Sequence, residues 1–346
     1  MKRYFGILFL ILTALAAGAA GAAVILRIAA GSISVPQNTT TVPVVRPKPE
    51  PSKVRAAARG TVSFYRHRAN SASLDATLLP ADHLGNGVIL TTDGWLMTAA
   101  SVLAGRDQVT AIFADRSVAT VDTATVITDA ATGVAFIHVP PGAFSVAQFG
   151  DDAQLQPGDA LYAVDPAHVR AGSVIAVREL PAQTRAEFTE STERLARRLI
   201  VSDASASAGT ALVNVYGETV GIVTASGQAV PTSFVSGIFK GIFESRKAIR
   251  PRAGMHYVSI DQLVGVSGPN FPRTGALLNG APAVERGSAA DAAGLRAGDV
   301  IVSVERDRVD ADHTLAELIQ QYAPGQTVGL TVLRSGKEQK FSIVLK

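Results

Sequence analysis

The sequence contains no cysteine among its 346 residues, and only 18% of the residues are charged. The absence of cysteine excludes disulfide bonds, zinc–thiolate sites and cysteine nucleophiles, although it does not indicate a compartment. Aromatic residues are also few, at 6%, and no basic stripe with interleaved aromatics is present. Because the net charge is only +3, the composition gives no reason to expect a nucleic-acid partner. The 47% hydrophobic content is enough for a folded chain with room for two or three domains.

One apolar run is long enough to cross a membrane. Lys2 and Arg3 precede an uncharged stretch, Phe5–Leu26, that ends at Arg27. A helix of this length spans the roughly 30 Å hydrocarbon core, whereas a cleaved signal peptide has a shorter apolar region of about 7–15 residues. We therefore predict a retained transmembrane anchor in the cytoplasmic membrane, with the folded domains periplasmic or extracellular. Small residues in the second half of the run leave cleavage as a signal peptide as the alternative.

Changes in composition and periodicity divide the rest of the chain. We predict an anchor, a Pro-rich linker, a β-rich domain, an interdomain helix with a linker, and an α+β domain over residues 1–31, 32–58, 59–230, 231–252 and 253–346. The β-rich domain has many short strand-like runs between turn signals, which is typical of an antiparallel barrel or sandwich. Within it, Gln183–Leu199 is dense in charge and is predicted to be a short surface helix or a solvated loop.

Two later elements are predicted from helical and turn patterns. Apolar residues at helical spacing predict a helix over Ser233–Arg246. In the last segment, Asp312–Tyr322 is predicted to be a helix that ends before Pro324-Gly325, and two strands are expected to meet at a turn, Ser335-Gly336. This mixture of strands and one helix predicts a compact α+β domain.

Sequence motifs in both folded segments resemble one family of proteins. The run from Gly287 to Ile301, with its elements Ala293-Gly294-Leu295 and Gly298-Asp299-Val300-Ile301, is similar to the PDZ signature of HtrA proteases. Gly85–Leu90 and Asp93–Thr98 resemble the strands that precede the catalytic His in the trypsin-like domain of those proteases. The resemblance implies a mainly β chain, in which a trypsin-like double β-barrel is followed by an α+β PDZ domain, with one N-terminal transmembrane helix.

The same resemblance implies that the catalytic triad has been lost. Where the family has its general base, orienting acid and nucleophile, this chain has Ser101, Gly133 and Ala208. A serine hydroxyl needs an adjacent base to become a nucleophile, and the base needs an orienting group. A one-residue insertion would instead place Ser207 at the nucleophile position, but only a histidine from elsewhere would then activate it. None of the six histidines matches a motif position or has metal-ligand spacing, so neither a metal nor a cofactor is expected.

The resemblance also implies a peptide-binding loop in the PDZ domain. Its residues here are Tyr257, Val258, Ser259 and Ile260, with Ser259 in place of a glycine, and the Asp312–Tyr322 helix is expected to form the other wall of the groove. PDZ domains add a peptide C-terminus as an extra strand and hold its carboxylate with backbone N–H groups.

We therefore expect a non-catalytic HtrA-like protein that binds peptide or protein C-termini or unfolded proteins in envelope protein quality control. Its contact with the membrane would be through the N-terminal helix, and the resemblance implies a homotrimer. The small net charge indicates no nucleic-acid partner. The alternatives are an active serine endopeptidase with a displaced catalytic site and a regulatory subunit of such proteases.

Overall fold

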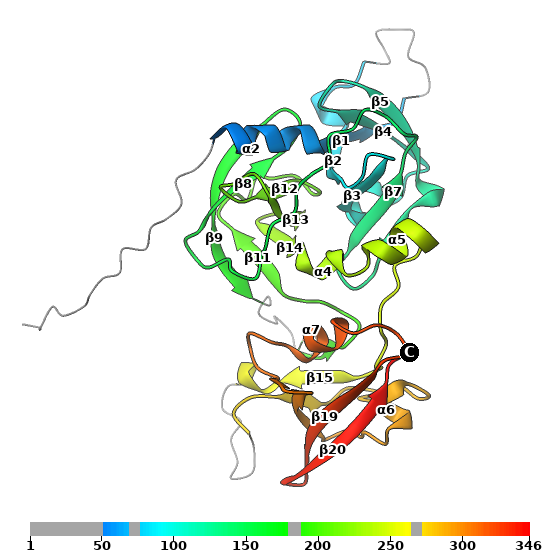
Figure 1. Cartoon of the computed structure of the whole chain (residues 1–346), viewed down its shortest axis with the longest axis vertical. Helices are drawn as coiled ribbons and strands as arrows, with labels where there is room; N and C mark the ends of the chain where they lie inside the picture. The colour runs from blue at the N-terminus through cyan, green and yellow to red at the C-terminus, as the bar shows by residue number, and fades with distance from the viewer. Residues whose placement is uncertain (1–50, 69–76, 179–187, 264–271) are drawn as a thin grey trace, which may run out of the picture. The chain divides into compact units, whose positions relative to one another are not determined.

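The computed structural model describes residues 51–68, 77–178, 188–263 and 272–346, which form two sheets and a closed barrel (Figure 1). The predicted anchor Phe5–Leu26 lies outside these residues. Within the described ranges, no helix is both long enough and apolar enough to cross a bilayer.

The first sheet contains seven antiparallel strands in the order β5-β4-β1-β2-β3-β7-β6. These strands are β1 (Thr61–Arg66), β2 (His83–Ile89), β3 (Trp95–Ala99), β4 (Gln108–Phe113), β5 (Val118–Asp122), β6 (Ile127–Asp129) and β7 (Val134–His138). A short helix, α3 (Ala100–Leu103), directly follows β3, and the 3-10 turns η1 (Ala58–Gly60), η3 (Pro80–Asp82) and η4 (Thr123–Thr125) lie between strands or before them.

The second β unit is a closed barrel of six strands in the order β11-β14-β13-β12-β8-β9. Its strands are β8 (Ala160–Val164), β9 (Val169–Arg178), β11 (Arg198–Val201), β12 (Ala211–Val213), β13 (Thr219–Ala225) and β14 (Gln228–Pro231). The prediction of a trypsin-like double barrel is confirmed as a pair of β units, of which the second is a closed barrel and the first a seven-stranded sheet.

Strands β2 and β3 are buried on both faces, because the side chains of each face pack in a different core. On β2 and β3, Val88 and Met97 point into a cluster shared with barrel residues such as Val213 and Ile222. The alternate residues, such as Leu96, pack in a separate core within the first sheet. Successive side chains of a strand point to opposite faces, so the continuous apolar runs reflect two cores.

Short helices flank the β units where a linker and one longer helix were predicted. The helix α2 (Pro51–Ala57) lies at the end of the predicted Pro-rich linker, and Val54 anchors it in the shared core. The predicted helix over 233–246 is two helices, α4 (Ser233–Ser236) and α5 (Phe239–Ser245). The break falls at Gly237, where the low helix propensity of glycine weakens a continuous helix.

The C-terminal domain is an antiparallel sheet in the order β10-β15-β16-β17-β19-β20, with β18 paired to β17. Its strands are β10 (Glu190–Ser191), β15 (His256–Ser259), β16 (Ala276–Leu278), β17 (Val300–Val304), β18 (Asp307–Arg308), β19 (Thr327–Arg334) and β20 (Lys337–Val344). The remaining elements are η5 (Ile260–Gln262), α6 (Ala289–Ala292) and α7 (Leu315–Gln320).

The elements predicted for this domain are present, with shorter helical bounds. Thr314, rather than Asp312, begins the helix, because its side chain caps α7 by accepting a hydrogen bond from the Glu317 N–H. The predicted hairpin turn is confirmed at Ser335-Gly336, where both residues have positive φ, as a two-residue type I′ turn requires.

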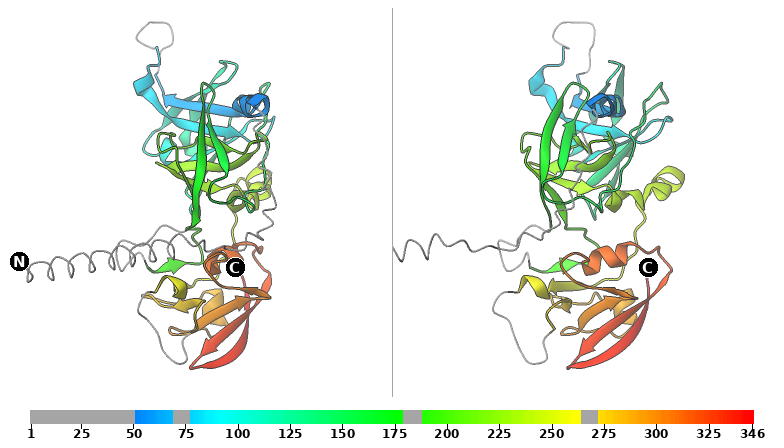
Figure 2. Two further views of the ribbon diagram at one scale, coloured as in Figure 1. Left: turned by 90° about the vertical axis from the view of Figure 1, so that its left-hand side faces the viewer. Right: turned by 60° about the vertical axis from the view of Figure 1, so that its left-hand side comes forward.

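The described part of the charged stretch 183–199 is not a helix. It is mostly turn and loop, as the second alternative predicted, but nearly all of its residues are at least partly buried, so it is not a solvated face. Residues 188–198, which we call the strap, contain β10 and lead into β11. Leu195 is buried, and its N–H donates to the Ala131 carbonyl at 3.0 Å. Figure 2 shows β10 as the short green strand beside the C-terminal sheet. Two charged side chains of the strap, Glu193 and Arg197, contact the C-terminal domain.

Candidate functional site

The segments that carry Ser101, Gly133 and Ala208 adjoin one another. Ser101 lies in α3, immediately after β3, and the N–H of its neighbour Ala100 donates to the Gly133 carbonyl at 2.9 Å. The Ala208 carbonyl accepts a hydrogen bond from the Asn86 N–H of β2 at 2.8 Å. The chain therefore brings together the three segments to which the family resemblance assigns the triad.

Close packing fixes the turn that carries Ala208 against β2. A Cβ atom built on Gly209, whose φ is +82°, would lie 1.8 Å from the Asn86 carbonyl oxygen. A Cβ atom on Gly85 would lie 2.5 Å from the Ala208 carbonyl oxygen and 2.6 Å from a methyl of Val102, next to Ser101. Only glycine at both positions allows this approach, which links the turn to α3.

The side chains at the three positions supply no triad chemistry. Ser101 is exposed, Gly133 has no side chain, and the methyl group of Ala208 packs against the core of the first sheet. The alternative nucleophile, Ser207, is half-buried. All six histidines are described, and none of their hydrogen bonds or ion pairs reaches Ser207.

A buried polar network that the sequence analysis did not predict lies beside Ala208. The Asn86 side chain accepts a hydrogen bond from the Ser63 hydroxyl at 2.9 Å and donates to the Thr210 hydroxyl at 2.9 Å. The His83 ring lies 3.1 Å from the same Asn86 oxygen. These hydrogen bonds connect His83 through Asn86 to the Thr210 hydroxyl. Because Thr210 is fully buried, a substrate does not reach this hydroxyl. The signal in the sequence was an asparagine within an otherwise apolar strand.

No metal centre accompanies these residues. Within the four described ranges, no group of three or more His, Asp, Glu or Cys side chains is arranged to hold a metal ion. His138 contacts Trp95 edge-on, with ring centroids 5.0 Å apart, and lies 3.8 Å from Asp93. It is therefore part of the packing at the end of β7 rather than of the segments around Ala208.

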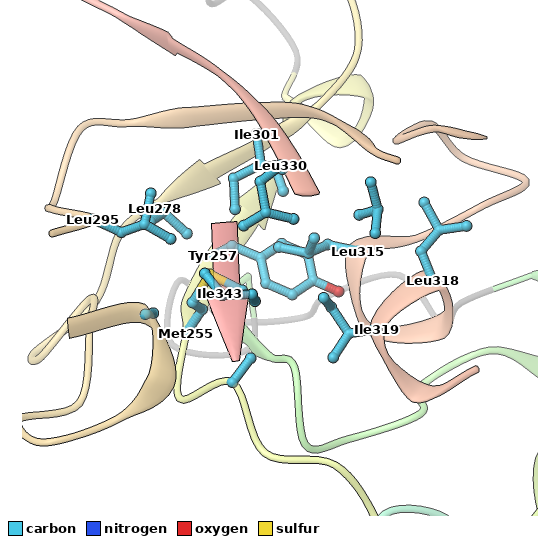
Figure 3. Close-up of a cluster of buried hydrophobic side chains, with 14 of the residues drawn as sticks. Met255, Tyr257, Leu278, Leu295, Ile301, Leu315, Leu318, Ile319, Leu330 and Ile343 are labelled. Atoms are coloured by element: carbon cyan, nitrogen blue, oxygen red, sulfur yellow. The ribbon is translucent and has the colours of Figure 1, made fainter. Parts of the chain in front are cut away.

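The predicted peptide-binding residues Tyr257, Val258, Ser259 and Ile260 are all buried and belong to β15 and the turn after it. Figure 3 shows the Tyr257 ring among the core side chains, with its hydroxyl group toward α7, where it accepts a hydrogen bond from the Ala316 N–H at 3.3 Å. These residues therefore offer backbone groups, rather than side chains, to a ligand. Ser259 has a φ of −69°, an ordinary extended conformation, so replacing the family glycine with serine causes no backbone strain here.

Successive residues of β15 direct their backbone N–H and C=O groups alternately toward β16 and toward β10. On the β16 side, the Ile260 N–H donates to Gly275 at 2.9 Å, and the His256 carbonyl accepts from Asn279 at 3.0 Å. Because hydrogen-bonded pairs alternate along antiparallel strands, the peptide groups of Tyr257 and Ser259 face the opposite edge. There β10 pairs with β15, with Glu190 opposite Tyr257 and Ser191 opposite His256.

Comparison with known proteins identifies both folded parts. Residues 85–222 match the trypsin-like peptidase domain, and residues 264–345 match the PDZ domain. The serine protease Do-like HtrA of Lactobacillus helveticus is 26% identical over 321 residues, which cover 85% of this chain and 77% of that protein. The serine endoprotease DegS of Haemophilus influenzae is 24% identical, with 85% and 86% covered.

Longer relatives and solved structures agree with this assignment. A probable periplasmic serine endoprotease, DegP-like, of Hahella chejuensis is 27% identical over 81% of this chain, which spans only 60% of that protein. The solved structure of the HtrA-type protease AlgW with a decapeptide has a TM-score of 0.59 at 20% identity, covering 86% of this chain and 98% of that chain. The serine endoprotease from Yersinia pestis has a TM-score of 0.53 at 20% identity, covering 87% and 98% of the two chains. The chain therefore contains a trypsin-like peptidase domain followed by a PDZ domain, and the relatives and solved structures to which it is similar over most of its length are HtrA-type serine proteases.

Proposed function

We propose that this chain is a non-catalytic HtrA-type protein that binds peptide C-termini or unfolded chains through its PDZ domain, in protein quality control outside the cytoplasm. The observation that carries the proposal is the chemistry at Ser101, Gly133 and Ala208, on three segments that contact one another. With no base, no orienting acid and no nucleophile, these three positions lack the groups that activate a serine. Loss of the base or the nucleophile alone lowers kcat by about a million-fold in a subtilisin-type enzyme.

The names of the relatives support a location outside the cytoplasm. Several are named as periplasmic serine endoproteases, which favours a location outside the cytoplasm for the folded domains, with the predicted helix Phe5–Leu26 as the membrane tether. The homotrimer implied by the family resemblance remains part of the proposal.

The second candidate function is an active serine endopeptidase. It is favoured by the names of the relatives, which are serine proteases. It requires a nucleophile and a base at other positions, and Ser207 has no histidine beside it in the described part of the chain.

Peptide binding is tested with paired ligands on the full chain. A labelled decapeptide ending in an apolar residue is titrated in its free-acid form and its C-terminally amidated form. Because a hydrogen bond to a charged group contributes about 1.5–3 kcal/mol, the amide should bind roughly ten-fold more weakly or worse. Ser259→Gly should leave binding intact, because Ser259 already has an unstrained backbone. Equal affinity for the two forms would exclude a carboxylate-binding site.

A further inference from the structure

A carboxylate of the chain itself is held by consecutive backbone amides at the start of the PDZ domain. Glu193, in the strap, accepts hydrogen bonds from the N–H groups of Ala253 and Gly254 at 3.0 and 2.9 Å, both through one carboxylate oxygen. Gly254 has a φ of +73°, and successive N–H groups in such a conformation form a concave nest for an anion. This arrangement is a carboxylate site with its ligand in place.

The residues before Glu193 lie as an added strand on β15. Thr192 donates its N–H to the Met255 carbonyl at 3.0 Å, and Glu190 stands opposite Tyr257. The strap runs antiparallel to β15 and reaches the nest at Glu193. Glu193 therefore occupies the place that the terminal carboxylate of a peptide would take after strand addition.

The helix α7 forms the second wall of this site. Arg197 of the strap makes a bidentate ion pair with Glu317, with an Nε–Oε1 distance of 2.7 Å. The Gln320 amide donates to the Thr192 carbonyl at 2.9 Å. The strap is therefore held by β15 and α7, the two elements predicted to line the peptide groove.

The surface beside the nest is predominantly basic. A cavity of about 340 Å³ adjoins Gly254, and its wall includes Arg252, Arg286 and Lys346 together with one acid, Glu285. This balance of charges favours an anionic ligand such as a carboxylate.

We infer that the nest at Ala253-Gly254 and the adjoining edge of β15 form a site for the carboxyl end of an extended peptide, and that the strap is its built-in competitor. This inference rests on the proposed peptide-binding function, and it moves the carboxylate site from Tyr257–Ile260 toward the start of β15. A peptide binds after displacing Glu193, so its apparent Kd equals the intrinsic Kd divided by the fraction of molecules in which the strap is open.

A reversible covalent lock tests the competition directly. Ser191 and His256 are opposite each other in a pair without mutual hydrogen bonds, because the bonds join Thr192 to Met255 on one side. Cα atoms in such pairs are about 4.5 Å apart, within the range for a disulfide. The native chain has no cysteine, so in a Ser191→Cys/His256→Cys variant the introduced thiols pair only with each other.

The full chain carrying this pair is titrated, oxidised and reduced, with a pool of labelled decapeptides that end in Val, Leu or Phe with a free carboxylate. Reduction should tighten binding at least about ten-fold, and it should leave the affinity of the native chain unchanged. Glu193→Gln, which weakens the hold of the nest on the strap, should bind more tightly than the native chain. Arg194→Ala, on the same strap, keeps the Glu193 and Thr192 hydrogen bonds and serves as the matched control.

The outcomes separate the inference from the function on which it rests. Equal binding to the oxidised and reduced forms would overturn the competition while leaving peptide binding in place. Absence of binding to every form, including Glu193→Gln, would overturn the proposed peptide-binding function and the competition with it.

Discussion

Two glycines with positive φ provide a matched test of how the turn at Ala208 is fixed. At Gly209 (φ +82°) a Cβ atom would lie 1.8 Å from the Asn86 carbonyl oxygen, whereas at Gly133 (φ +77°) it would meet no atom within 4 Å. Alanine in a left-handed conformation costs about 1–2 kcal/mol at either position. Overpacking adds about 1–3 kcal/mol at Gly209 alone. Gly209→Ala should therefore lower the free energy of unfolding by roughly 2–5 kcal/mol, and Gly133→Ala by roughly 1–2 kcal/mol.

The assay is urea unfolding followed by the fluorescence of Trp95, the single tryptophan of the chain, which is buried in the core shared by the two β units. Both variants lose the same glycine flexibility in the unfolded state, so the difference between them reports the contacts of the added methyl group with Asn86 and Thr98. Equal destabilisation of the two variants would refute the close packing of the turn on β2, and with it the position of Ala208.

Three further predictions follow from other contacts. Arg250 makes a bidentate ion pair with buried Asp129, with both N–O distances 2.7 Å, so Arg250→Met should cost about 3–5 kcal/mol in the same assay, and adding Asp129→Asn should recover part of the loss. The Arg68 guanidinium lowers the pKa of the Asp82 carboxyl, so this carboxylate contributes stability above its unfolded pKa and loses it as the pH falls through the folded value. Asp82→Asn should accordingly be destabilising at pH 7 and neutral at the acidic end of a pH series. Carbonate extraction should leave the chain in the membrane fraction if Phe5–Leu26 is a retained anchor, and recovery of a soluble protein lacking this segment would identify a signal peptide.

The turns and strands predicted correctly were those specified by residue types and patterns close together in the sequence. Ser335-Gly336 was predicted as a turn because a Ser-Gly pair between two strand-like runs is a turn signal, and both residues have positive φ. The strands around Asp93-Gly94 were predicted from alternation and turn residues, and β2 and β3 pair there. These features depend on residues that are adjacent in the sequence, so a single sequence is enough to predict them.

The features that were missed depend on contacts between distant residues. Nothing local to the strap indicated that Glu193 would bind the amides of Ala253 and Gly254, which lie about sixty residues later in the sequence. That the segments at Ser101 and Ala208 lie close together was expected only from the resemblance to a family. The structure shows the hydrogen bonds that hold these segments together.

The most direct test of the central claim is labelling of the native full chain with a serine-directed fluorophosphonate, alongside digestion of an unfolded casein substrate. Trypsin serves as the positive control for both assays. Because Ser101, Gly133 and Ala208 supply no base, acid or nucleophile, we predict neither labelling nor proteolysis above background. Labelling or proteolysis that is lost in the Ser207→Ala variant would contradict the account and identify an active peptidase with a displaced nucleophile.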